Sequence, residues 1–129
     1  SLDSVKVAQE IERFSLARNK RPKVFIEVNT SKEETKFGVA EEEVLILADK
    51  ISGCSNLELI GFMTIAPFSG DDAIVRQAFK RLRLIRDDIS RRLSKNLYLS
   101  MGMSDDFETA IEEGADFIRI GRAIFGERD

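Results

Sequence analysis

The sequence contains no histidine and no tryptophan, and it has a single cysteine and a single tyrosine. Without histidine, the chain itself supplies no Ser-His or Cys-His pair for nucleophilic catalysis and no histidine ligand for a metal ion. The lone Cys54 excludes an internal disulfide and a cysteine-cluster metal site, and we interpret its thiol as structural. The sequence therefore predicts neither a metal centre nor a histidine-dependent active site.

Long hydrophobic runs, a signal-peptide pattern and an excess of positive charge are also missing. The 129 residues carry 20 Lys and Arg against 23 Asp and Glu, a net charge of −3, which argues against a nucleic-acid-binding protein. No segment is apolar enough to span a membrane, so we expect a cytoplasmic protein. No proline-rich or glycine-rich linker interrupts the chain, and residues 1–129 are predicted to form a single domain.

Helical and strand-like patterns alternate along the chain. Helical periodicity predicts helices over 4–20, 41–51, 71–93 and 105–113. Apolar, β-branched runs predict strands over 23–29, 57–65, 97–101 and 116–120. This alternation is typical of the α/β class with parallel strands.

Four βα units are half of a (β/α)₈ barrel, which typically needs about 250 residues. We therefore predict a partial barrel, with a flavodoxin-like open sheet as the alternative topology. A free-standing half barrel leaves two strand edges and an apolar inner face exposed, and such surfaces favour association.

The strongest indication of a binding site follows the last two predicted strands. Gly102 and Ser104 come after one strand, and Gly121 and Arg122 come after the next. Small residues between a strand and a helix expose backbone N–H groups that bind phosphate, and (β/α)₈ barrels frequently place phosphate at these two loops. The alternative is structural, with turn glycines and Ser104 as a helix N-cap.

Arg119 lies inside the last predicted strand. If Ile118 and Ile120 pack outward against helices, Arg119 points into the barrel, where an arginine needs a carboxylate or a ligand as its partner. The structural alternative is an ion pair with Glu27 or Asp116.

We interpret most of the other polar residues at the predicted strand ends as structural. We expect Asp105 and Asp106 to cap the following helix and to face away from a bound anion, which they would repel. Thr30 and Ser31 are interpreted as capping the loop after their strand, while Thr64 falls at the predicted ligand mouth.

The stretch GMSDDFETAIEEGADFIRIGRAIFG, residues 102–126, resembles the pyridoxal-phosphate homeostasis proteins, relatives of the alanine racemase barrel domain. The resemblance extends through GFMTIAP (61–67) and FIEVNTSKEETKFG (25–38) to residues 1–3, which look like the end of a preceding strand. It implies a (β/α)₈ barrel of which this chain is the C-terminal half to two-thirds, without the upstream βα units. Because the chain starts at Ser1, we expect a processed or excised piece.

The resemblance also implies a ligand, pyridoxal 5′-phosphate (PLP), held in the barrel mouth. Carried over by position, Ser104 and the backbone amides around Met103, Gly121 and Arg122 would hold the phosphate, and Arg119 would face the pyridine nitrogen. A permanent cation there disfavours protonation of the ring nitrogen, which makes the ring a poor electron sink. No catalytic residue is predicted, and the family implies a carrier or buffer of intracellular PLP.

The sequence departs from the family at two positions. The family's covalent lysine lies upstream of this chain, and none of the eight lysines here falls inward at a strand's C-terminal end; Lys23 begins a strand and Lys36 lies in a loop. Arg122 stands where many members have a small hydroxyl residue, so its side chain either contacts the phosphate or swings outward. We expect this chain alone to bind PLP weakly or not at all, and to associate with itself or with a complementing N-terminal fragment.

Two other functions remain open at this point. An alanine-racemase-like enzyme needs two bases, commonly a lysine and a tyrosine, and the only tyrosine is Tyr98 inside the third predicted strand. A phosphate-binding or structural half barrel that self-assembles is the second alternative, and it would bind phosphate without regard to the pyridine ring.

Overall fold

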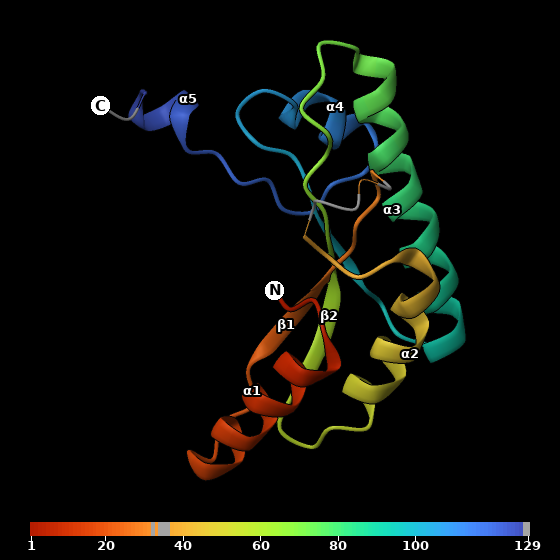
Figure 1. Cartoon of the computed structure of the whole chain (residues 1–129), viewed down its shortest axis with the longest axis vertical. Helices are drawn as coiled ribbons and strands as arrows, with labels where there is room; N and C mark the ends of the chain where they lie inside the picture. Colours follow the sequence, from red (N-terminus) through yellow and green to blue (C-terminus); the bar gives the residue numbers. More distant parts are fainter. Residues whose placement is uncertain (32, 34–36, 128–129) are drawn as a thin grey trace.

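A computed structural model describes residues 1–31, 33 and 37–127 of the chain. Its centre is a parallel three-stranded sheet in which the strands lie side by side in chain order (Figure 1). The strands are β1 (Lys23–Glu27), β2 (Glu58–Met63) and β3 (Tyr98–Ser100). Single parallel bridges extend this order on both sides, from Leu2 to Ile26 and from Ser100 to Phe117. The bridge at Leu2 agrees with the interpretation of residues 1–3 as the end of a strand.

The helices form a layer in the same order. They are α1 (Val5–Ala17), α2 (Glu41–Ser52), α3 (Asp72–Leu93), α4 (Phe107–Glu112) and α5 (Arg122–Phe125). The first four pack on one another in succession, while α5 stands apart at the end of an extended segment (Figure 1). An open flavodoxin-like sheet reverses its strand order at a switch point, and this sheet does not. The arrangement supports the predicted barrel sector; which part of a barrel it represents stays a prediction.

The predicted helix boundaries agree closely with the structure for the first three helices. The Ser4 hydroxyl accepts a hydrogen bond from the Val7 N–H at 3.2 Å and caps α1. The Asp71 carboxylate accepts from the Ala73 N–H at 2.9 Å and caps α3. Gly53 ends α2, as expected from its position after the periodic apolar residues. Local sequence signals therefore determine where these helices begin and end.

One face of the sheet packs against the helices and forms the core. Its largest fully buried side chains include Ile26, Phe62, Leu99, Phe79, Leu82 and Ile51. Burying one such side chain contributes roughly 1.5–3 kcal/mol to stability, so this layer is the main source of the folding free energy.

The opposite face of the sheet carries an aromatic cluster. The Phe25 and Phe117 ring centroids lie 5.7 Å apart and those of Tyr98 and Phe117 lie 6.0 Å apart, both in edge-to-face geometry. Tyr98 is 40% exposed and Phe117 is 48% exposed. This is the open apolar inner face that a partial barrel is predicted to have.

The prediction of a fourth strand over 116–120 is wrong. Phe117 makes one bridge, accepting from the Met101 N–H at 3.0 Å, but the Arg119 N–H then bonds the carbonyl of Gly102 at 2.9 Å. Gly102 has a φ of +96°, a left-handed conformation that turns the chain away from regular pairing. The short helix α5 that follows was not predicted.

The segment over 30–37 is described only in part. Lys32 and residues 34–36, including Lys36, lie outside the described residues. Within the part of the chain that the structure describes, no helix is long and apolar enough to cross a membrane.

Gly61 allows the close approach of β2 and β3, and its replacement tests the sheet. A Cβ atom at Gly61 would lie 2.1 Å from the Tyr98 carbonyl oxygen, whereas a Cβ at Gly70 would meet nothing within 4 Å. We expect Gly61→Ala to lower the free energy of unfolding by at least about 2 kcal/mol, and the matched Gly70→Ala by less than about 0.5 kcal/mol. Urea denaturation curves measure both, and equal midpoints would contradict this account.

Candidate functional site

Arg119 is held near the C-terminal ends of the strands by neutral acceptors. Its Nη1 donates to the Ser100 hydroxyl at 2.9 Å and its Nη2 donates to the Thr64 carbonyl at 3.0 Å. Burial lowers the pKa of Arg119, and the negative charges of Glu27 and Asp106 oppose that shift. The Arg119 guanidinium nevertheless stays cationic, because arginine side chains are not deprotonated in proteins. The site therefore contains a half-buried positive charge.

The ion pair considered for Arg119 does not form among the described residues. No carboxylate oxygen of Glu27 or Asp116 makes a salt bridge with it in the part of the chain that the structure describes. The Asp116 carboxylate instead accepts from the Leu99 N–H at 2.7 Å and lies 3.7 Å from an Arg86 nitrogen. The remaining N–H groups of the Arg119 guanidinium are thus available to a ligand.

Thr64 joins the strand ends beneath Arg119 and is fully buried, at 0% exposure. Its hydroxyl donates to the Val28 carbonyl at 2.8 Å and lies 2.9 Å from the Thr30 hydroxyl. Its backbone N–H bonds the carbonyl of Ser100 at 3.2 Å, and its own carbonyl accepts from Arg119. The sequence predicts that Thr64 lies at the ligand mouth. No sequence pattern indicates that Thr30 is its hydrogen-bond partner.

Ser104 lies beside the start of α5, as the phosphate-site prediction requires. Its hydroxyl accepts from the Ala123 N–H at 3.1 Å. Across the described residues, the N–H groups of Gly121 and Arg122 have no hydrogen-bond acceptor, and the space next to the Gly121 Cα is open. The structure thus brings together one hydroxyl and two free amides.

Met103 and the two aspartates are arranged differently from the prediction. The Met103 N–H donates to the Asp106 carboxylate at 2.6 Å, so this amide is not free for a phosphate. The expectation that the Asp106 side chain caps the following helix is wrong, because the bend after Gly102 leaves an N–H that this carboxylate, three residues later, satisfies instead. The orientation of Asp105 and Asp106 relative to a bound anion stays a prediction. Asp106 is the N-cap residue of α4, yet its side chain makes no capping bond to that helix.

The Arg122 side chain turns outward. It forms an ion pair with Asp105 and lies 3.5 Å from a Glu127 carboxylate oxygen. The hydrogen bond and charge of Asp105 raise the pKa of Arg122. This pairing favours the second alternative for Arg122, in which only its backbone amide contacts the phosphate, and the choice between the two stays a prediction.

No described lysine reaches the site. Every lysine side chain in the described ranges is exposed, and Lys23 begins β1, at the opposite end of the sheet from Thr64. Lys32 and Lys36 lie outside those ranges. The same part of the chain holds no group of three or more His, Cys, Asp or Glu residues placed to bind a metal ion.

The consecutive parallel strands and the layer of helices that covers them define an α/β domain of the alanine racemase N-terminal type. The family model described as "Alanine racemase, N-terminal domain" matches residues 1–129, and the chain belongs to this family. An alanine racemase of Clostridium difficile superimposes with a TM-score of 0.81 at 13% identity, over 98% of this chain and 33% of that one, which shows the shared fold.

Within the family, the chain is similar to proteins named pyridoxal phosphate homeostasis protein. It is 44% identical over 129 residues to the one from Aquifex aeolicus, covering 99% of this chain and 57% of the relative. It is 39% identical over 136 residues to the human one, covering 100% of this chain and 50% of the relative. The chain thus spans about half the length of the curated relatives it matches, and the predicted resemblance is confirmed at this level.

A solved relative contains PLP. PipY of Synechococcus elongatus with PLP bound superimposes with a TM-score of 0.87 at 28% identity, over 98% of this chain and 59% of that chain.

The bond from Ser104 to α5 gives a prediction that needs no ligand. We expect Ser104→Ala to remove the hydrogen-bond acceptor of the Ala123 N–H and to increase hydrogen exchange at this amide several-fold. The global free energy of unfolding should change by less than about 0.5 kcal/mol, because the bond is exposed. Ser69→Ala, which removes an acceptor of the Asp71 N–H, is the matched control. Unchanged exchange at Ala123 would show that Ser104 does not hold α5.

Proposed function

We propose that this chain is the phosphate-binding and ring-binding part of a barrel that binds PLP in PLP homeostasis, and that it lacks the covalent lysine. The observation that carries this proposal is the half-buried Arg119 guanidinium, bound only by neutral acceptors. It lies two residues before Gly121, whose free amide and that of Arg122 mark the start of α5.

The residues present fit the phosphate end of PLP. The N–H groups of Gly121 and Arg122 point from the start of a helix, and such groups bind phosphate oxygens well. The Ser104 hydroxyl accepts from Ala123, and its own proton is available for donation. The outward ion pair of Arg122 with Asp105 neutralises a carboxylate that would otherwise repel the phosphate.

Arg119 fits the ring end. PLP supplies an aldehyde that combines with amines and a pyridine ring that can accept electron density. Arg119 keeps a permanent positive charge at this position and has no proton to give at the pH of the cell. A cation facing the ring nitrogen opposes protonation of that nitrogen, so the site would retain PLP without activating it for catalysis.

Two predicted contributions do not fit this geometry. The Met103 amide is already bonded to Asp106, and the Arg122 guanidinium is directed to Asp105. We therefore assign the phosphate to Ser104 and to the backbone of Gly121 and Arg122. An alanine-racemase-like enzyme receives no support from the described residues, because Tyr98 lies among aromatic side chains and every described lysine is exposed.

The second candidate function is a phosphate-binding half barrel that assembles with itself. The observation that favours it is the open aromatic cluster of Phe25, Tyr98 and Phe117. This candidate differs from the first in one measurable respect, because its binding of phosphate does not depend on a contact with the pyridine ring.

Arg119→Ala distinguishes the two candidates. Under the PLP proposal we expect PLP binding to weaken about tenfold or more, the usual effect of losing a charge-assisted hydrogen bond, while binding of inorganic phosphate changes less than about twofold. Calorimetric titrations of both ligands, carried to millimolar concentrations, measure the ratio. Arg91→Ala, which removes an exposed guanidinium on α3, is the control. An equal loss for both ligands would favour the phosphate-binding half barrel.

The proposal that the chain lacks the covalent lysine leads to a separate prediction. After incubation with PLP and reduction with borohydride, we expect the intact mass of the chain to show no stoichiometric adduct. The physical reason is that the described lysines are all exposed, and Lys23, the one at a described strand, begins β1 rather than ending it. A single adduct on one defined lysine would show that the chain builds its own covalent site.

A further inference from the structure

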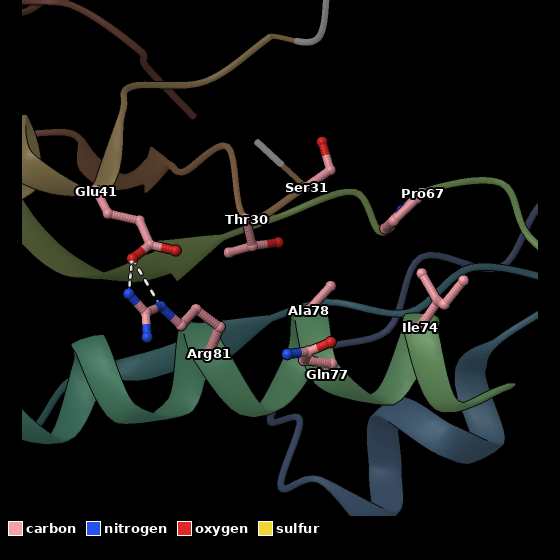
Figure 2. Close-up of a pocket in the computed structure, with 8 residues that line it drawn as sticks. All are labelled: Thr30, Ser31, Glu41, Pro67, Ile74, Gln77, Ala78 and Arg81. Atoms are coloured by element: carbon pink, nitrogen blue, oxygen red, sulfur yellow. Dashed lines mark hydrogen bonds and ion pairs between the residues drawn. The ribbon is translucent and has the colours of Figure 1, made fainter. Parts of the chain in front are cut away.

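Two glutamate side chains lie near the C-terminal ends of the strands, and they differ in how their charges are paired. Glu41 begins α2, and its Oε2 atom accepts from Arg81 Nε at 2.6 Å. Figure 2 shows this bond between Glu41 and α3 on the helix side of the strand ends. Glu27 is the last residue of β1, and among the described residues its carboxylate makes neither a hydrogen bond nor an ion pair. The charge of Glu27 is therefore free to act on a ligand.

The alternation of side chains along β1 places Glu27 on the open inner face of the sheet. Ile26 and Val28 are buried in the core beneath the helix layer. Because successive side chains of a strand point to opposite faces, Phe25 and Glu27 point to the other side. The ring of Phe25 indeed contacts that of Phe117 in the aromatic cluster. Glu27 thus lies next to this cluster, on the side of the ligand mouth.

The register of the sheet puts Glu27 in the same row as the partner of Arg119. Glu27 pairs with Met63 on β2, and Met63 pairs with Ser100 on β3. The Ser100 hydroxyl accepts from Arg119 at 2.9 Å. Since neighbouring strands lie about 4.8 Å apart, the backbones of Glu27 and Ser100 are separated by roughly 10 Å. Burial lowers the pKa of Arg119 and the charge of Glu27 opposes this shift, so the two charges interact across the row.

The two aspartates on the other side of the mouth are engaged within the chain. Asp105 forms an ion pair with Arg122, and the Asp106 carboxylate accepts from the Met103 N–H at 2.6 Å. Glu27 differs from both, because no described cation or N–H group offsets its charge. It therefore contributes an unpaired negative charge to the face on which Arg119 contributes a positive one.

We propose that Glu27 is a specificity-determining residue of the PLP site, and that it favours pyridine-ring phosphates carrying an ammonium group over those carrying a neutral group at the same position. This inference rests on the function proposed above. Charges on a concave, partly apolar surface act over several ångströms, so the preference does not require that Glu27 touch the ligand. Pyridoxamine 5′-phosphate, the aminated form of PLP, belongs to the favoured class.

The test compares pyridoxamine 5′-phosphate with pyridoxine 5′-phosphate, which has a hydroxyl group where the other compound has the ammonium group. Calorimetric titrations give a Kd for each, and their ratio is the preference for the ammonium compound. We expect Glu27→Gln, which keeps the shape and removes the charge, to lower this preference about threefold or more. Glu58→Gln removes the same charge at the start of β2, the opposite end of the sheet, and should change the preference by less than about 1.5-fold.

Two further variants keep the proposal testable if Glu27→Gln does not fold. Glu27→Thr removes the charge with a side chain suited to a strand and should lower the preference similarly, whereas Glu27→Asp keeps the charge and should stay within about twofold of the unmodified chain. An unchanged preference in a folded neutral variant, or an equal loss in Glu58→Gln, overturns the inference.

Failure of this inference can be distinguished from failure of the proposed function. If Arg119→Ala weakens PLP binding as expected and the neutral Glu27 variants leave the preference unchanged, only the role of Glu27 is overturned. If neither ring phosphate binds saturably to the unmodified chain up to about 10 mM, the proposed ligand site and this inference are overturned together.

Discussion

The buried hydrogen bond from the Thr64 hydroxyl to the Val28 carbonyl holds together the strand ends on which the rest of the site depends. Thr64 bonds the segment after β1 through its side chain, β3 through its N–H and Arg119 through its carbonyl. Four segments that are distant in sequence therefore meet at one residue with no exposed surface. In such a setting each polar atom must be paired, so the position of Arg119 is tied to that of the sheet.

The electrostatic character of the strand ends is set by how their charged side chains are paired. Asp105 is neutralised by Arg122 and Asp106 is bonded to a backbone N–H, whereas Arg119 contacts only uncharged acceptors. The net result is one partly desolvated cation that no described carboxylate bonds directly and on which the negative charges of Glu27 and Asp106 act from a distance. Under the proposed function, the ligand's phosphate meets the free N–H groups at the start of α5, and its aromatic ring meets the Arg119 guanidinium.

The sequence allowed the layered fold to be predicted, because helix caps at Ser4 and Asp71 and the apolar strand patterns are local signals. The strand expected over 116–120 could not be judged correctly, since its outcome depends on the left-handed backbone of Gly102 fourteen or more residues earlier. Ser104, Gly121 and Arg119 could be proposed as site residues from the sequence because they lie at predicted strand ends. The Thr30 and Thr64 pair, 34 residues apart, and the pairing of Arg122 with Asp105 depend on tertiary geometry that no local pattern encodes.

The strands of the sheet lie in the order in which they occur along the chain, and this order affects how such a domain folds. The contacts between elements connect each unit with the units next to it in the sequence, in both the strand layer and the helix layer. Because no early segment must wait for a late one to complete its pairing, units can dock successively as the polypeptide leaves the ribosome. An architecture of this kind also tolerates addition of a unit at an edge without repacking of the middle, which makes its length easy to change during evolution.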